Sequence, residues 1–289
     1  MPDLLQGGLV KIGGLKEAQK HNDAHGHLVR FNEDTGRWKV KLCAGGELGV
    51  KPANLEACPA DKIFDNGNIK VEQIPGRGYG VVAVRAFERG SVLFQEAPLA
   101  RVNKDTGLTA KRNAAAAQLM QEVYALASSG TFDPRDPAAW PEEVRERLAK
   151  VMDIQAMTVF NKASLETQTE WLLLQDGDKE GADKTPGGVL RTNGFDDDEG
   201  FVSLYATTSR ANHSCDPSAT RYAQGSDNSV QLVAARAIGA GEEIFVSYLD
   251  TSDAGGSGGM TVEERRSILQ SKYGFVCECP LCIRESFQR

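Results

Sequence analysis

The chain has 289 residues, of which 40% are hydrophobic and 25% are charged, and its formal net charge is −7. Such a composition is typical of a globular protein with a sizeable core, in one large domain with a small companion or in two domains. The acidic balance argues against nucleic-acid binding as the main activity, because phosphate neutralisation needs clustered lysine and arginine. It suits a cationic substrate such as a lysine-rich peptide, although charge that serves only solubility would give the same balance.

The N-terminal segment lacks the basic start and the long apolar run of a secretory signal. No stretch of the chain reaches the ~18–20 apolar residues that a membrane span needs. The sequence therefore predicts no export signal and no membrane span, and a location in the nucleus, the cytoplasm or both. It does not indicate an oligomeric state.

Residues 1–58 consist of short β-rich runs between turn formers. The pattern predicts strands at 9–12, 27–31 and 38–42, and several strands at such close spacing favour a small barrel. The order of these runs resembles the small Src-homology-like barrels that are appended to other domains. Such a barrel either binds peptides or packs on a neighbour as a structural appendage. The polar segment 58–68 predicts a connector and a domain boundary.

Six further short strands are predicted on either side of a helical segment. They lie at residues 69–71, 80–84, 91–95, 201–205, 230–234 and 244–248. Between them, the segment of about 105–190 contains an alanine-rich helix at 114–126 and a second helix with Pro141 in its first turn. The predicted fold class is mainly β with a helical insertion.

Two later segments are predicted to be irregular. Residues 176–200 are rich in Asp, Gly and Lys and predict a mobile loop, whose acidic run at 196–199 is either a solvated loop or a docking patch for a basic substrate. Residues 251–259 predict a flexible linker. A helix then begins at a capping box, residues 261–264, and ends at Gly274.

Cys277, Cys279 and Cys282 crowd into the last 13 residues. In a chain without an export signal, such crowding points to a metal site rather than to disulfides. Three thiolates this close can share one tetrahedral zinc ion, which needs a fourth ligand in a structural site. Cys215 is the candidate, with His213 as a possible substitute, and a cluster of free or buried thiols is the alternative. A four-cysteine site is closed and structural, since no position stays open for water.

Four motifs follow one another along the chain. They are Arg-Gly-Tyr-Gly at 77–80, Asn-His-Ser-Cys-Asp-Pro at 212–217, Gly-Glu-Glu-Ile-Phe-Val-Ser-Tyr at 241–248, and the terminal cysteines. Together they resemble the SET domain over about residues 68–285, and the form with a post-SET C-x-C-x-x-C is similar to the SET–MYND branch. The resemblance implies a SET-domain β fold with a pseudoknot at 68–250, and a post-SET helix with a zinc-binding tail at 260–289.

The resemblance also implies an activity, the transfer of a methyl group from S-adenosylmethionine to a lysine amine of a protein, histone or non-histone. It places eight residues at the cofactor: Arg77, Gly78, Tyr79, Gly80, Asn193, Asn212, His213 and Phe275. Phe275 is alternatively a core aromatic. In the family, the pseudoknot brings Asn212 and Tyr248 together, so Tyr248 is implied as the catalytic residue. Tyr205 is implied as a second aromatic of the lysine channel, or is a structural tyrosine.

This implied chemistry needs little acid or base. The lysine amine must be neutral to attack, although its free pKa is ~10.4. An apolar channel beside a sulfonium cation would lower that pKa. The Tyr248 hydroxyl would then orient the amine lone pair toward the methyl carbon, and in-line positioning can supply a large share of the rate.

Two features depart from the family pattern. Ser218 stands where related proteins often carry asparagine, and no cysteine lies between Cys58 and Cys215, so the zinc-binding MYND module of the branch is expected to be missing. The implied partner is a protein with an exposed lysine, without direct nucleic-acid binding. The alternatives are a catalytically weak SET scaffold that binds proteins, and a zinc-dependent hydrolase, for which the chain offers no H-E-x-x-H set.

Overall fold

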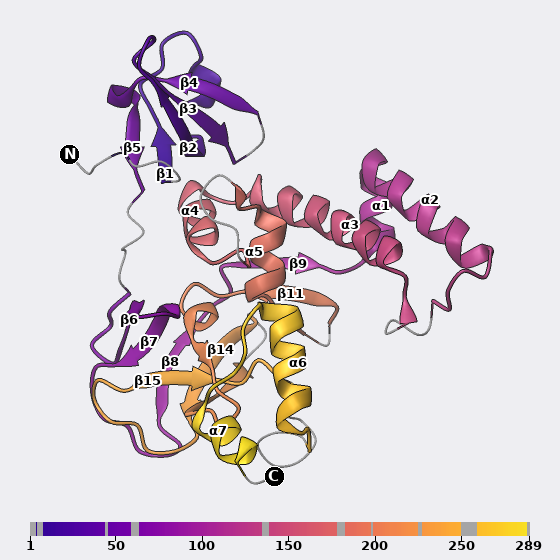
Figure 1. Cartoon of the computed structure of the whole chain (residues 1–289). Helices are drawn as coiled ribbons and strands as arrows, with labels where there is room; N and C mark the ends of the chain where they lie inside the picture. The colour runs from indigo at the N-terminus through magenta and orange to yellow at the C-terminus, as the bar shows by residue number, and fades with distance from the viewer. Residues whose placement is uncertain are drawn as a thin grey trace. The chain divides into compact units, whose positions relative to one another are not determined.

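A computed structural model describes residues 4, 8–43, 46–58, 64–134, 139–177, 183–197, 199–224, 227–249 and 259–287. The chain forms two compact units, each built from two separate stretches of sequence (Figure 1). Unit 1 comprises Met1–Pro59 and Ala100–Leu204, and unit 2 comprises Ala60–Leu99 and Tyr205–Arg289. Among the helices of the described ranges, none is long and apolar enough to cross a membrane.

Unit 1 begins with a five-stranded antiparallel sheet in the order β4-β3-β2-β1-β5. Its elements are β1 (Leu9–Ile12), η1 (Gln19–His21), β2 (His25–Asn32), β3 (Arg37–Leu42), β4 (Glu47–Val50), η2 (Pro52–Asn54) and β5 (Leu55–Ala57). The three strands predicted here are confirmed, and β4 and β5 extend the sheet. The side chains of Ile12, Leu28 and Val40 are buried in its core. Closure into a Src-homology-like barrel stays a prediction.

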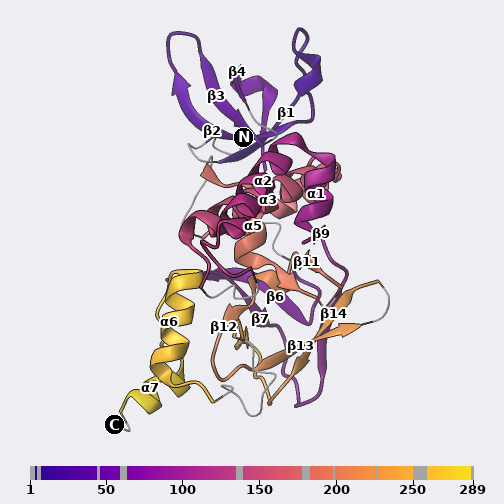
Figure 2. The ribbon, with the colours of Figure 1, turned by 90° about the vertical axis from the view of Figure 1, so that its right-hand side faces the viewer.

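The second stretch of unit 1 is the helical insertion. Its elements are β9 (Ala100–Asn103), α1 (Thr106–Arg112), α2 (Ala114–Ser128), α3 (Glu142–Phe160), α4 (Leu165–Leu173), α5 (Pro186–Asn193), β10 (Phe195–Asp196) and β11 (Phe201–Leu204). The two predicted helices are confirmed as α2 and α3, which lie side by side (Figure 2). Val151 of α3 packs there against Ala116 and Met120. The indole N–H of the buried Trp171 donates to the Pro186 carbonyl at 3.0 Å and ties α4 to α5.

The prediction of a mobile loop at 176–200 is wrong for the parts of this segment that form α5 and β10. Thr185 caps α5, because its side chain accepts a hydrogen bond from the Gly188 amide. Two of the glycines that make this segment look irregular, Gly187 and Gly188, are buried in α5. A Cβ at Gly188 would collide with the carboxylate of Asp176, so glycine is needed here for close packing rather than for a turn.

The acidic run of the same segment is paired within unit 1. Asp197 lies 2.5 Å and Glu199 lies 3.1 Å from the guanidinium of Arg101. Asp196 pairs with a neighbouring lysine at 2.9 Å. The remaining acidic residue, Asp198, lies outside the described residues. These ion pairs favour a structural role for the run over the docking of a basic substrate.

Unit 2 contains two small sheets. Their strands are β6 (Ile69–Ile74), β7 (Gly78–Ala83), β8 (Val92–Glu96), β12 (Asn212–His213), β13 (Ala219–Gln224), β14 (Ser229–Ala234) and β15 (Glu243–Val246). One sheet has the order β12-β15-β7-β6 and the other the order β13-β14-β8. The strands predicted in these regions are confirmed. The structure adds β13, which lies antiparallel beside β14 (Figure 2).

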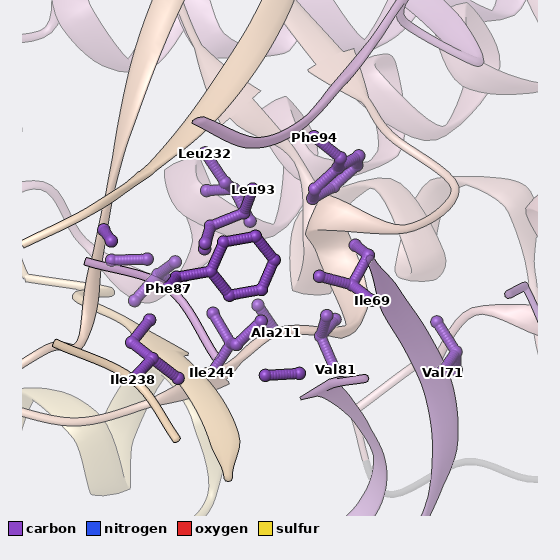
Figure 3. Close-up of a cluster of buried hydrophobic side chains, with 14 residues drawn as sticks. Ile69, Val71, Val81, Phe87, Leu93, Phe94, Ala211, Leu232, Ile238 and Ile244 are labelled. Atoms are coloured by element: carbon purple, nitrogen blue, oxygen red, sulfur yellow. The ribbon is translucent and has the colours of Figure 1, made fainter. Parts of the chain in front are cut away.

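The hydrophobic core of unit 2 collects side chains from both sheets (Figure 3). Ile69 and Ile244 come from the first sheet and Leu232 from the second, and the ring of Phe87 lies among them. Full burial of each such side chain stabilises the fold by about 1.5–3 kcal/mol. This packing fixes β15, and with it the start of the segment that leads to Tyr248.

Two helices of unit 2 end the described chain, α6 (Val262–Tyr273) and α7 (Pro280–Ser286). The predicted capping box is confirmed, because Thr261 accepts from the Glu264 amide while the Glu264 carboxylate accepts from the Thr261 amide. Gly274 ends α6 with a left-handed φ of 78°, as predicted. The predicted linker at 251–259 lies outside the described residues, apart from Gly259.

Candidate active site

Two motif segments of unit 2 are neighbouring strands. β12 runs parallel to β15, with Asn212 opposite Phe245 and His213 opposite Val246. The core described above holds β15 in place, and the short β12 is aligned on it. The N-H-S-C segment and the strand that leads to Tyr248 therefore lie side by side.

Tyr248 contacts both sequence neighbours of Asn212. Its hydroxyl donates a hydrogen bond to the Ala211 carbonyl at 2.9 Å, and its backbone amide donates to Nδ1 of His213 at 3.0 Å. Its side chain is thereby bonded to the residue just before the N-H-S-C segment, and its backbone to the histidine of that segment. The resemblance implied that Asn212 and Tyr248 come together. In the structure, Tyr248 contacts the residues on either side of Asn212.

Aromatic rings surround Tyr248. Its ring centroid lies 4.8 Å from that of Tyr273, 5.3 Å from that of His213 and 6.5 Å from that of Phe275. Burial raises the pKa of the Tyr248 phenol above its ordinary value, with the nearby Tyr273 adding to the effect. The phenol is therefore protonated at neutral pH, so it can orient a partner by hydrogen bonding but cannot act as a base.

The tautomer of His213 follows from its contacts. Because Nδ1 accepts from the Tyr248 amide, the ring proton lies on Nε2, which is 3.2 Å from the sulfur of Cys215. Burial lowers the pKa of His213 to about 4, so the ring is neutral near pH 7. With both nitrogens engaged, the His213 side chain links Tyr248 to Cys215. This geometry disfavours His213 as the fourth zinc ligand.

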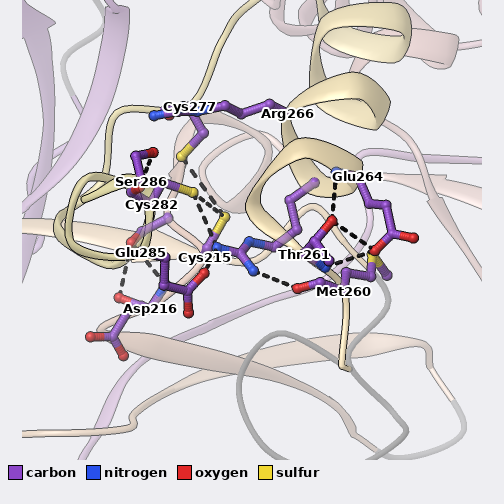
Figure 4. Close-up of polar contacts among 12 residues, drawn as sticks. Cys215, Asp216, Met260, Thr261, Glu264, Arg266, Cys277, Cys282, Glu285 and Ser286 are labelled. Carbon is purple, nitrogen blue, oxygen red and sulfur yellow. Dashed lines mark hydrogen bonds and ion pairs between the residues drawn. The ribbon is translucent and has the colours of Figure 1, made fainter. Parts of the chain in front are cut away.

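Four cysteines converge from the N-H-S-C segment and the C-terminal tail. The sulfur atoms of Cys215, Cys277, Cys279 and Cys282 all lie within 4.8 Å of one another. Those of Cys277 and Cys282 are 3.9 Å and 3.5 Å from that of Cys215 (Figure 4). Tetrahedral zinc at ~2.3 Å from each sulfur sets the sulfurs roughly 3.8 Å apart, whereas a disulfide requires about 2.05 Å. The donor set therefore fits one zinc ion with no open position.

Glu243 is a site residue that the sequence prediction missed. One of its carboxylate oxygens accepts from the Asn212 side-chain amide at 2.8 Å, and the other lies 2.8 Å from the Arg77 guanidinium. The Asn212 amide also donates to the Tyr79 carbonyl at 3.2 Å. A Cβ at Gly80 would lie 2.6 Å from the Ile74 side chain, 2.9 Å from the Glu243 carboxylate and 3.1 Å from the Asn212 amide, which explains the glycine. Glu243 thus joins three motif segments.

Glu96, at the end of β8, is a second carboxylate that the prediction missed. It accepts from the Thr207 amide at 3.1 Å and from the amide and hydroxyl of Thr208. Burial raises the pKa of this carboxyl above its usual range. The bonds hold the short turn η5 (Thr208–Arg210), which leads directly into β12. Glu96 therefore anchors the entry to the N-H-S-C segment.

Two predicted residues have other recorded contacts. Tyr205 is buried, and its hydroxyl donates to the Asn228 carbonyl at 2.8 Å, which favours the structural alternative for this tyrosine. Asn193 belongs to unit 1, where its side-chain amide donates to the carbonyls of Gln175 and Val189. The lysine-channel role of Tyr205 and the cofactor role of Asn193 stay predictions.

The family model described as the SET domain matches residues 78–249, which is more than half of the chain. The chain belongs to the SET domain family. The match begins in the glycine-rich turn and ends one residue after Tyr248, so the SET domain contains both strands of the β12–β15 pair. It also contains Cys215, while the other three cysteines of the cluster follow it.

Several relatives match parts of this SET-domain protein. Histone-lysine N-methyltransferase SMYD3 of Mus musculus is 42% identical over 81 residues, which are 28% of this chain and 17% of that protein. Histone-lysine N-methyltransferase set5 of Schizosaccharomyces pombe is 26% identical over 213 residues, which are 74% of this chain and 50% of that protein. The matches thus span 17% to 50% of the length of these relatives.

Among solved structures, Rubisco LSMT bound to AdoMet is similar to this SET-domain protein at 13% identity and a TM-score of 0.36. The similarity covers 76% of this chain and 57% of that chain. At that TM-score nothing further follows from it.

Proposed function

We propose that this SET-domain protein transfers a methyl group from S-adenosylmethionine to the side-chain amine of a lysine in a protein. The observation that carries the proposal is the placement of Tyr248, whose phenol is held against the N-H-S-C segment within a cluster of aromatic rings. Two relatives that bear the name histone-lysine N-methyltransferase support the same activity.

Tyr248 acts in this proposal by orientation. Its proton is donated to the Ala211 carbonyl, so the lone pairs of the phenol oxygen remain able to accept a hydrogen bond from an incoming amine. S-adenosylmethionine, when bound, supplies an electrophilic methyl group on a sulfonium. The amine must arrive neutral, and the aromatic walls formed by Tyr273 and Phe275 lower its pKa from ~10.4 by excluding water. Holding the reacting atoms in line then supplies a large share of the rate.

The cofactor is proposed to lie against the glycine-rich turn and the N-H-S-C segment. The proposed contacts in unit 2 are Arg77, Gly78, Tyr79, Gly80, Asn212, His213 and Phe275. Gly78 has a φ of 71°, which favours glycine, and close packing of protein side chains leaves no space for a Cβ at Gly80, so both glycines are needed for the backbone conformation of this turn. The charge of Arg77 is offset by Glu243, which lessens repulsion of a sulfonium. The cofactor contact of Asn193, which belongs to unit 1, stays a prediction.

The cysteine cluster is proposed to hold one structural zinc ion. Cys277 follows Phe275 by two residues, and the ring of Phe275 lies 6.0 Å from that of His213. Zinc bound to Cys215 and the tail cysteines would fix this aromatic wall beside Tyr248. A closed four-sulfur site leaves no position for water, so zinc builds the site and takes no part in the chemistry. The same closure speaks against the zinc-dependent hydrolase.

The proposal includes the domain organisation of the chain. It comprises a small barrel at 1–58, a SET domain at 68–250 with its helical insertion, and a post-SET tail at 260–289. The proposal also includes a histone or non-histone protein substrate and a nuclear or cytoplasmic location, and the name histone-lysine N-methyltransferase of two relatives supports a protein substrate. The acidic net charge of −7 is compatible with a lysine-rich substrate.

The test combines cofactor binding with transfer. The zinc-loaded protein is titrated with S-adenosylmethionine in a calorimeter, and then incubated with cofactor carrying a labelled methyl group, with histones and with a cell extract. Binding with incorporation of label is expected, and Asn212→Ala should weaken the binding. Binding without incorporation would support the alternative of a catalytically weak scaffold. Absence of both cofactor binding and label incorporation would refute the proposed methyltransferase activity.

A further inference from the structure

A buried cation lies directly behind the cysteine cluster. This is Arg265 of α6, whose side chain is 0% exposed. One guanidinium nitrogen, Nη1, donates to the Met260 carbonyl at 2.7 Å. The other, Nη2, donates to the carboxylate of Glu285 at 2.6 Å and to the sulfur of Cys282 at 3.5 Å. Arg265 therefore touches one of the four proposed metal ligands.

The surroundings of Arg265 compensate its charge only in part. Glu285 supplies one carboxylate, which is 33% exposed. Among the described residues, the guanidinium Nε has no hydrogen-bond partner. A buried charge is costly unless it is paired, and a neutral thiol is a weak acceptor, whereas a thiolate is a charged one. This environment fits a cluster of thiolates better than a cluster of thiols.

The proposed metal site, in contrast, has an excess of negative charge. One Zn²⁺ with four thiolates carries a net charge of about −2. Three of the four cysteines are buried, so this excess negative charge lies largely out of water. A cation that donates to one of the sulfurs offsets part of the excess, and such outer contacts tune how tightly a metal is held.

We propose that Arg265 is a positioning residue of the zinc site, whose guanidinium holds the metal-bound sulfur of Cys282, tightens zinc binding and shields the thiolates from electrophiles. The inference rests on the zinc site proposed above. Arg266 has a different task, because its Nε donates to the backbone carbonyl of Cys277 at 3.0 Å and so holds the main chain.

The competing explanation is purely structural. Arg265 also joins α6 to α7 through its ion pair with Glu285, and loss of that link alone could loosen the tail. The two explanations separate in Glu285→Gln, which removes the ion pair but leaves the guanidinium beside Cys282. A role through sulfur predicts that zinc affinity is retained in this variant, whereas a role through the ion pair predicts that it falls.

The experiment compares Arg265→Met, Arg265→Lys and Glu285→Gln with the whole wild-type chain. Arg284→Met is the matched control, because Arg284 is exposed and lies two residues from Cys282. Zinc content is measured first, then zinc affinity by competition with a chromophoric chelator. The rate at which sulfur displaces iodide from iodoacetamide in the zinc-loaded protein gives the shielding.

Arg265→Met should bind zinc roughly 10–100-fold more weakly and react faster with iodoacetamide. Arg265→Lys, which keeps the charge, should recover part of the loss. Arg284→Met and Glu285→Gln should stay within about threefold of wild type, a difference under about 0.7 kcal/mol.

The inference is overturned if Arg265→Met binds zinc as tightly as wild type, or if Glu285→Gln loses as much affinity as Arg265→Met. If Arg265→Met does not fold, Glu285→Gln carries the test, because a tenfold loss there contradicts the role through sulfur. A folded wild-type chain that holds no zinc would refute both the proposed metal site and the proposed role of Arg265.

Discussion

The hydroxyl of Tyr248 allows stability and activity to be measured apart. In Tyr248→Phe the ring keeps its contacts with Tyr273 and His213, so no cavity forms. The substitution removes one hydrogen bond of 2.9 Å and leaves the buried carbonyl of Ala211 without this donor. An unsatisfied buried acceptor costs about 1–3 kcal/mol of unfolding free energy.

That cost is small beside the total stability of a domain, about 5–15 kcal/mol, so Tyr248→Phe should remain folded. Its methyl transfer should fall by roughly 100-fold, because the amine loses the group that orients it. Denaturant unfolding gives the stability, and single-turnover transfer of labelled methyl gives the rate. Tyr124→Phe is the matched control, since Tyr124 is 58% exposed on α2, and it should change neither quantity.

A folded Tyr248→Phe protein that transfers methyl within about twofold of the wild-type rate would refute the orienting role. A stability loss above about 4 kcal/mol would instead indicate that the hydroxyl has contacts beyond Ala211, because one neutral hydrogen bond does not supply so much.

Four further results are expected. Because burial raises the pKa of Tyr248, kcat/KM for transfer should rise up to about pH 10 as the free substrate lysine deprotonates, and Tyr248→Phe should keep this profile at a lower rate; a wild-type fall before that pH, absent from the variant, would contradict it. Glu243→Ala should weaken S-adenosylmethionine binding roughly 10–100-fold in calorimetry, because Asn212 loses a charged acceptor; unchanged binding would exclude Glu243 from the site. Removal of zinc with a chelator, followed by metal analysis, should abolish cofactor binding, and a metal-free protein that still binds would show that the cysteine cluster does not build the site. Thr261→Ala should lower the unfolding free energy by about 1 kcal/mol through the lost helix cap, and equal denaturant midpoints would mean that the cap adds nothing.

Local signals make part of the structure predictable. The strands β1 and β14 and the capping box of α6 depend on residues a few positions apart, so their patterns are visible in the sequence. The cysteine cluster is also predictable, because zinc chemistry requires a fourth ligand for the three tail cysteines and Cys215 is a suitable one.

The remainder depends on contacts between distant residues. The helix α5 is hidden by two glycines, Gly187 and Gly188, which serve close packing on Asp153 and Asp176 respectively. The role of Glu243 arises from the parallel register of β12 and β15, which brings Asn212 beside it. The choice between Cys215 and His213 as a zinc ligand depends on the Tyr248 amide, which fixes the ring proton of His213. No sequence pattern within either of the two contacting segments predicts these contacts.

The central claim is methyl transfer to lysine at the site built around Tyr248. The most direct measurement is tandem mass spectrometry of histones and of a cell extract after incubation with zinc-loaded protein and S-adenosylmethionine carrying a deuterated methyl group. We predict labelled methyl on lysine Nζ with the wild-type chain, and sharply less with Tyr248→Phe. Absence of labelled lysine, from protein that binds zinc and the cofactor, would contradict the claim.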